Sequence, residues 1–471
     1  MRALLGTLAC VALVGCTTSD AGDANLADSG SATDPHLFPG GSGSTGGKGG
    51  TVVLGDGGGA ADGGAPLSGD AAVGDLPCDV AQVLTVCQGC HTATPRFGAP
   101  MPLVTAADFA APAVSDPSRK VRDLVALRTH NEANPMPPSG LLPDKDLAVL
   151  DAWLDAGAPA GDTACDAIDA GPALEPVGED ALDCKVTQRF RAHAAGGSDG
   201  FHVPDTAGNL YQCFTFASPF NGVTQATAWA PIIDDERVVH HWVLYRTKTA
   251  QVDGGVAPCN MPGDATFVAG WAPGGQNFVM PADVGLELPA ANEWLILQLH
   301  YHNVGGLSDA DDASGVGFCT TDTPRAHDAG IFTLGTIGIN IPAGAVGHLE
   351  SGMCGSLLTA GLAQPVHIIA TFPHMHELGV SFRTDIMRGS NDGPVENVID
   401  VPHFSFDDQR MYPIDPPIEF RPRDAIRTTC RYDNPGSVAV RFGEKTEDEM
   451  CFNFAMLYPI SLFTMGRSCL L

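Results

Sequence analysis

The sequence predicts a multidomain protein in which a small all-α module precedes a larger all-β region of antiparallel sandwiches. At 471 residues, the chain is long enough for several domains that each bury a core. Between Cys78 and Cys165, apolar residues recur at helical spacing. From Cys184 onwards, short apolar stretches are separated by Gly, Pro and Asp, which is typical of antiparallel β-sandwiches.

The N-terminus reads as an export signal. Residues 1–16 comprise Met1, Arg2 and an apolar stretch that is too short for a membrane span. The stretch ends in Leu13-Val14-Gly15-Cys16, which resembles a bacterial lipobox. We expect cleavage before Cys16, lipid attachment to its thiol, and anchoring to a bacterial membrane on the periplasmic face or the cell surface. An ordinary signal peptide with a chance cysteine is the alternative.

Two segments are expected to act as linkers. Residues 17–77 consist mostly of Gly, Ser, Asp, Ala and Thr, which cannot bury enough apolar surface to order the chain. Residues 167–183 form a second, shorter linker. The net charge of −30 argues against a nucleic-acid partner, because a phosphate backbone requires a basic face.

The helical module, residues 78–166, carries Cys87-Gln88-Gly89-Cys90-His91. Two cysteines followed at once by histidine match c-type haem attachment, in which Cys87 and Cys90 form thioethers and His91 is an axial ligand. A zinc site or a disulfide is the alternative reading. Met136 lies in a proline-bracketed loop that resembles the second axial ligand of small class I cytochromes c. His130 and Met101 are its competitors.

A metal site is predicted around Phe372-Pro373-His374-Met375-His376. The apolar run before this motif reads as a buried strand, and residues two apart on a strand point to the same side. His374 and His376 should therefore project together, with Met450 as the third ligand. Two imidazoles with a thioether suit copper better than zinc. Taken alone, the pair could equally be two satisfied histidines at a strand end.

The remaining motifs carry a family resemblance from about Cys184 to the C-terminus. They are Val239-His240-His241-Trp242, Leu297-Gln298-Leu299-His300-Tyr301, Pro281-Ala282-Asp283-Val284-Gly285, Ser314-Gly315-Val316, Asp328-Ala329-Gly330-Ile331 and Glu449-Met450-Cys451. With the His374 motif, in this order, they resemble the copper type II ascorbate-dependent monooxygenases.

The resemblance implies two jelly-roll-like sandwiches, at 184–335 and 336–471, with one copper ion each. Its first copper site would use His240, His241 and His300, and its second would use His374, His376 and Met450. Adjacent strand residues face opposite ways, so His240 and His241 can share a metal only at a bulge or a strand end. His302 is the substitute if His300 is the wrong choice.

Export makes disulfides permissible for the 14 cysteines. Cys78 and Cys165 flank the helical module and could bridge its ends. The resemblance implies four further pairs: Cys184–Cys319, Cys213–Cys259, Cys354–Cys469 and Cys430–Cys451.

The activity implied by the resemblance is hydroxylation of a C–H bond by O2, with dioxygen activation at His374, His376 and Met450 and electron storage at the all-His site. The fused haem suggests an exported electron donor in addition to ascorbate or another one-electron reductant. Peptide-amidating relatives have an arginine where this chain has Phe372, so we expect a neutral, apolar or aromatic small-molecule substrate. The alternatives are a non-catalytic redox or copper-handling lipoprotein, and a haem/copper reductase of O2 or peroxide.

Overall fold

The computed structural model describes residues 75–161 and 176–470, apart from gaps at 115, 132–134, 139, 198, 260, 407, 444–446 and 464–466. The predicted lipidation site, Cys16, and the tether up to residue 74 lie outside the described residues. Among the residues that are described, no helix combines the length and the apolar character needed to cross a membrane.

The first described segment folds into a small helical module. Its helices are α1 (Cys78–Leu84), η1 (Cys87–Gly89), α2 (Ala106–Ala110), α3 (Val121–Thr129) and α4 (Asp144–Asp155). Helix α4 lies where helical spacing predicted a helix, and it buries Leu150, Trp153 and Leu154. The Trp153 ring meets Phe109 edge to face at 4.7 Å, so the module has an apolar core of its own.

Residues 188–321 form two facing sheets around one core. The five-stranded sheet has the order β6 (Gly255–Pro258), β3 (Leu210–Ala217), β10 (Trp294–Tyr301), β5 (Val239–Thr247) and β7 (Thr266–Trp271). Facing it are β1 (Gln188–Arg191), β12 (Gly315–Thr321), β4 (Gln225–Ile232), β9 (Val284–Glu287) and β8 (Phe278–Val279). Phe214 and Trp242 of the first sheet share a core with Trp229 and Phe318 of the second.

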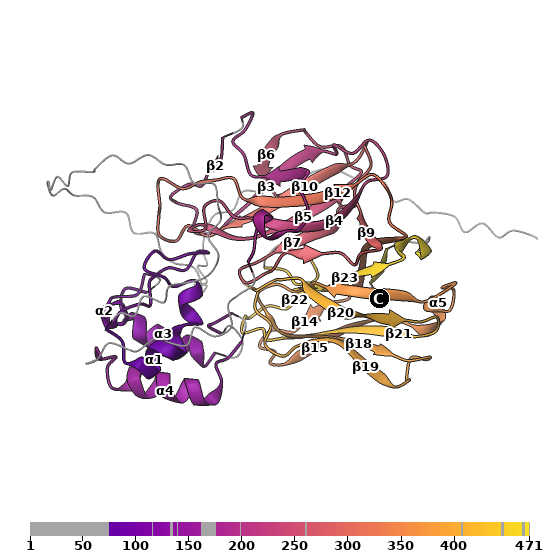
Figure 1. The fold of residues 1–471 in the computed structure, drawn as a ribbon. Helices are drawn as coiled ribbons and strands as arrows, with labels where there is room; N and C mark the ends of the chain where they lie inside the picture. The colour runs from indigo at the N-terminus through magenta and orange to yellow at the C-terminus, as the bar shows by residue number, and fades with distance from the viewer. Residues whose placement is uncertain are drawn as a thin grey trace, which may run out of the picture. The chain divides into compact units, whose positions relative to one another are not determined.

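The second half has the same two-layer plan (Figure 1). One layer is β15 (His348–Cys354), β21 (Ala425–Tyr432), β18 (Gly379–Met387) and β19 (Val395–Val401). The other contains β13 (His327–Thr336), β23 (Cys451–Tyr458), β16 (Val366–Thr371), β20 (Tyr412–Phe420), β17 (Pro373–His374) and β24 (Ser468–Leu470).

The remaining elements of the described residues are short. The helices are η2 (Glu179–Ala181), α5 (Ser356–Thr359) and η3 (Ile460–Leu462). Two strand pairs complete the fold, β2 (Phe201–His202) with β11 (Asp311–Asp312) and β14 (Asn340–Ile341) with β22 (Val440–Arg441).

Strand β13 belongs to both halves. Its first residues pair with β9 of the first half, and residues 330–336 pair with β23 of the second, which creates a continuous 11-stranded sheet. The expected boundary near Gly335 therefore falls inside a strand. The sheets were expected to be antiparallel, and two strand pairs differ from this expectation. Strand β13 runs parallel to β9 and also parallel to β24. Both partners are reached by crossover connections, which do not reverse the direction of the chain as a hairpin does.

Three of the expected disulfides are present, namely Cys184–Cys319, Cys213–Cys259 and Cys430–Cys451. The prediction of a Cys354–Cys469 disulfide is wrong. Both residues are free thiols, and their side chains are hydrogen-bonded to each other. The parallel addition of β24 to β13 brings the two sulfurs together without joining them. Cys165, the expected partner of Cys78, lies outside the described residues.

Gly335→Ala should lower the thermal unfolding temperature of the metal-free protein strongly. Gly335 has φ +144°, and a Cβ there would lie 1.9 Å from the Cys451 carbonyl oxygen of the paired strand. Strain and overlap together should cost about 3 kcal/mol or more. Gly344→Ala is the control, because Gly344 also has a positive φ but has no atom within 4 Å of its ideal Cβ. Equal shifts in the two variants would contradict the prediction.

Candidate functional site

A cluster of three histidines lies where β5 and β10 pair. His241 stands directly across from His300, whereas the next pair joins Val239 to Tyr301. His240 is therefore the extra residue of a β-bulge, the geometry that lets two adjacent residues face the same side. The three rings lie 4.8–5.3 Å apart, and one nitrogen from each falls within 4.8 Å of the others.

The protonation of this cluster suits a metal. The Nε2–H of His300 donates to the side-chain oxygen of Asn209, while its Nδ1 is buried without a hydrogen-bond partner. The Nδ1 atoms of His240 and His241 lie 3.1 Å apart. Burial, followed by the neighbouring histidines, lowers the pKa of His241 and His300 well below 6.5. Neutral imidazoles are the ligating form, so these residues fit a copper ion.

Tyr211 holds one ring of this cluster in place. Its ring stacks on that of His300 with the centroids 4.3 Å apart and the planes parallel. Tyr211 stands across from His300 on β3, so the contact follows from strand register. The sequence left His300 and His302 as candidates for the third ligand, and the structure places the His300 ring 4.9 Å from His240 and 4.8 Å from His241. The His302 ring is 6.0 Å from His240 and 6.4 Å from His300.

A second pair of histidines, His374 and His376, lies beside the start of β23. Their rings are 5.3 Å apart and nearly perpendicular. His374 pairs with Phe452, and continuing this antiparallel register by two residues places His376 opposite Met450. His374 lies on β17, His376 lies just after that strand and Met450 lies just before β23, and the backbone N–H groups of His376 and Met450 both donate to the Glu449 carboxylate.

Both rings of this pair are oriented through Nδ1. His374 Nδ1 lies 2.5 Å from the Gln409 side-chain oxygen, and His376 Nδ1 lies 2.9 Å from the Asp448 carbonyl oxygen. An acceptor at Nδ1 fixes the proton there and leaves Nε2 for a metal. Burial lowers the pKa of His374 to about 3, so its imidazole is neutral.

Glu449 ties the two halves of this second site together. Its carboxylate is fully buried and accepts backbone N–H groups from His376 at 2.9 Å, Leu378 at 2.7 Å and Met450 at 3.2 Å. Burial raises its pKa to about 8, and these three bonds act in the opposite direction.

The backbone around Met450 has two further restraints. The Tyr432 hydroxyl donates to the Met450 carbonyl oxygen at 2.7 Å. The next residue, Cys451, is bonded to Cys430 on β21, with the sulfurs 2.04 Å apart. The backbone around Met450, the predicted thioether ligand, is thus held by the Glu449 carboxylate, the Tyr432 hydroxyl and the Cys430–Cys451 disulfide.

One aromatic side chain bridges the two sites. The Phe406 ring lies 6.4 Å from that of His241 and 6.1 Å from that of His376, edge to face in both cases. Its carbonyl oxygen accepts from the Gln409 side chain, the same amide that orients His374. Both sites therefore lie within reach of one side chain.

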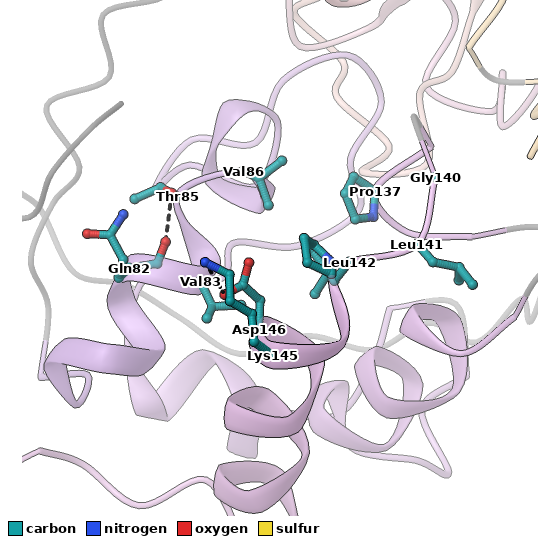
Figure 2. Close-up of a pocket in the computed structure, with 11 residues that line it drawn as sticks. Gln82, Val83, Thr85, Val86, Pro137, Gly140, Leu141, Leu142, Lys145 and Asp146 are labelled. Carbon is teal, nitrogen blue, oxygen red and sulfur yellow. Dashed lines mark hydrogen bonds and ion pairs between the residues drawn. The ribbon is translucent and has the colours of Figure 1, made fainter. Parts of the chain in front are cut away.

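The helical module carries Cys87, Cys90, His91 and Met136, the residues predicted to bind a haem, and none of the four lines the cavity found in this module. Cys87 and Cys90 are free thiols, and His91 Nδ1 lies 2.7 Å from the Met101 carbonyl oxygen, which leaves Nε2 for iron. A cavity of about 420 Å³ lies between the residues before Cys87 and those after Met136. Figure 2 shows the side chains around it, with apolar lining from Val83, Val86, Pro137, Leu141 and Leu142.

His130 and Met101, the alternatives to Met136 in the prediction, have other contacts in the structure. His130 Nε2 is held by the Asp151 carboxylate at 2.9 and 3.1 Å. Met101 packs against the core of the module. Met136 is half-buried, and its backbone N–H donates a hydrogen bond to the Arg128 carbonyl oxygen.

Sequence reasoning missed the residues that orient the ligands, which are Asn209, Tyr211, Phe406, Gln409 and Glu449. Of these, only Glu449 carried a signal, because a carboxylate beside a candidate methionine ligand in an apolar context needs a partner. The others lie far along the chain from the histidines that they contact, and no spacing pattern links them.

The comparisons with known proteins cover the two β halves. The family model for the copper type II ascorbate-dependent monooxygenase N-terminal domain matches residues 197–308, and that for the C-terminal domain matches residues 327–469. Tyramine beta-hydroxylase of Caenorhabditis briggsae is 28% identical over 288 residues, which are 56% of this chain and 48% of that protein.

Two other similar proteins come from mammals. Dopamine beta-hydroxylase of Equus caballus is 27% identical over 259 residues, covering 51% of this chain and 42% of that protein. DBH-like monooxygenase protein 2 of Mus musculus is 28% identical over 242 residues, covering 48% and 39%. The matched part of the chain spans less than half the length of each of these relatives.

Glu449→Gln should weaken copper binding at the His374 site and leave the His240 site loaded. The amide nitrogen of glutamine would face backbone N–H donors, which should cost about 2 kcal/mol. Copper titration followed by copper absorption spectroscopy, with thermal unfolding of the metal-free protein, measures both effects. Glu447→Gln, at an exposed position two residues earlier, is the control. Unchanged copper affinity in Glu449→Gln would refute the positioning role.

Proposed function

This chain belongs to the copper type II ascorbate-dependent monooxygenase family, and on that premise we propose that it hydroxylates a C–H bond of a small molecule with O2. The observation that carries the proposal is the His240 bulge, which turns a strand-paired histidine set into a buried cluster with an unpartnered nitrogen. The two copper ions, when bound, supply the one-electron chemistry by which O2 is reduced.

The two sites have different donors and hence different proposed roles. His374 and His376, held through Nδ1, together with the weak donor Met450, favour the reduced ion that O2 requires. His240, His241 and His300 hold the ion that stores the second electron. Phe406, between the two sets, limits the water that enters the space between them.

We propose a neutral apolar or aromatic substrate. The Phe454 ring lies 5.8 Å from His374, and Phe452 and then Phe442 continue the row at 6.0 and 5.8 Å. Phe442 is exposed and Phe452 is buried, so a row of contacting aromatic rings extends from the surface to His374. Phe372, which sequence reasoning set beside the site, is buried against Phe267 instead. Tyramine and dopamine, after which two relatives are named, carry aromatic rings.

The electron supply is proposed to be the helical module. Cys87, Cys90, His91 and Met136 would hold a c-type haem, which supplies one-electron transfer when bound. An exported donor protein or ascorbate would reduce it. The three disulfides indicate an exported protein, and attachment of a lipid at Cys16 would keep it at a membrane.

His240→Ala should reduce bound copper from two ions to one per chain, and Met450→Ala should weaken the second ion selectively. Metal analysis and product formation from a neutral aromatic compound such as 2-phenylethanol, with O2 uptake recorded in parallel, measure the consequences. His202→Ala, at an exposed histidine paired with Asp311, is the control. Two bound coppers with no product from any aromatic substrate would favour a copper-handling role, and O2 uptake without product would favour a reductase.

A Cys87→Ala, Cys90→Ala double variant should lose the haem absorbance but retain both coppers. Thioether formation requires both thiols, whereas the copper ligands all lie in the β halves. Optical spectra of the protein, exported from cells able to mature cytochromes c, provide the measurement. Absence of haem from the unaltered protein would contradict the proposed electron supply and leave the monooxygenase proposal standing.

A further inference from the structure

The loop that follows the Cys87–His91 motif contacts the turn that precedes β5, the strand that carries His240 and His241. The Phe97 N–H donates to the Glu236 carbonyl oxygen at 2.5 Å, and the Gly98 N–H donates to that of Arg237 at 3.3 Å. Glu236 and Arg237 precede His240 by only four and three residues. The loop is therefore bonded to the segment that enters the bulge.

Side chains of the same loop strengthen this contact. Phe97 is 9% exposed and belongs to the core of the first sandwich, where its ring meets Trp271 edge to face at 5.9 Å. Arg96 Nε lies 2.8 Å from the Glu236 carboxylate. Cys90 packs against the same core. The end of the candidate haem motif is thus already in contact with the sandwich that carries the His240 site.

Gly98 brings the loop against a histidine beside that site. Its φ is +74°, and a Cβ there would lie 2.6 Å from both Cβ and Nδ1 of His302. The His302 ring is 6.0 Å from His240, and its backbone N–H donates to the Val238 carbonyl oxygen at 2.8 Å. A residue without a side chain allows this approach.

We propose that residues 96–98 are a docking element that holds the helical module at the all-His copper site, with Phe97 as the anchor and Gly98 against His302 as the point of closest approach. The inference rests on the proposed function, because it gives the fused haem a defined partner, the His240 site of its own chain. His302 is then a contact residue of the module and not a copper ligand.

The step served by this docking moves one electron at a time. A haem held by Cys87, Cys90, His91 and Met136 would pass one electron to a copper ion held by His240, His241 and His300, so that iron(II) would be oxidised as copper(II) is reduced and no bond would be made or broken. An exported one-electron donor or ascorbate would then restore iron(II). Two such events supply the electrons that one hydroxylation consumes.

The test measures haem reoxidation directly, without substrate. The full-length protein, loaded with haem and copper(II), is mixed with one equivalent of reductant under anaerobic conditions, and the haem absorbance and the copper(II) resonance signal are followed. Phe97→Ala should slow electron transfer from haem to copper by about tenfold or more, because losing a buried phenyl ring depletes the docked arrangement.

Charge reversal supplies a second, milder variant. Arg96→Glu should slow the same transfer several-fold, and adding Glu236→Arg should restore part of the rate. Arg119→Glu is the matched control, because Arg119 pairs with Asp116 inside the module. A third variant is Gly98→Ala, and its control is Gly157→Ala. Gly157 also has a positive φ, but an ideal Cβ built there lies 3.6 Å from the nearest atom.

The outcomes separate the inference from the function that it rests on. Missing copper in the unaltered protein would refute the proposed function itself, whereas missing haem would refute the proposed electron supply, and with it the docking element, and leave the monooxygenase proposal standing. Normal haem and copper content with unchanged transfer in Phe97→Ala, Arg96→Glu and Gly98→Ala would overturn the docking element alone. If Phe97→Ala does not fold, the Arg96→Glu rate and its rescue by Glu236→Arg decide the matter.

Discussion

The pairing of β23 with β17 is the interaction on which the second site depends. Met450 lies immediately before the first residue of β23, and the strand itself places Cys451 in a disulfide and Phe452 across from His374. The same strand pairs with β13 along its other edge. Ligand geometry is therefore set by the hydrogen bonds of a sheet, which is why residues about 75 positions apart in the chain can form one site.

Both sites use the same electrostatic arrangement by different means. Buried imidazoles stay neutral because desolvation disfavours the charged form, and three of them, His300, His374 and His376, have one ring nitrogen engaged by an oxygen. That oxygen comes from an amide at His300 and His374 and from a carbonyl at His376. Preorganisation of this kind lowers the cost of binding a metal, because the rings need not reorient.

The choice of His240, His241 and His300 as ligands came from the family resemblance. The shared face of His374 and His376 could be predicted from their strand spacing, and the need for a bulge or a strand end at His240 could be predicted from the alternation of side chains along a strand. The shared strand β13 could not, since the sequence shows only that both neighbouring segments are apolar. Gln409 and Asn209 were also inaccessible, because each acts through one contact across long sequence separation. The unjoined thiols Cys354 and Cys469 differ from the expected bridge although the strands bring them together.

The continuous sheet has a mechanical consequence. Because β13 is hydrogen-bonded to β9 in one half and to β23 in the other, the halves cannot swing apart as separate bodies without breaking main-chain bonds. The spacing of the two histidine sets is thus built into the backbone. The segment that carries Phe406 contacts both sets and lies outside these strand pairs, so it can be displaced while the continuous sheet stays intact.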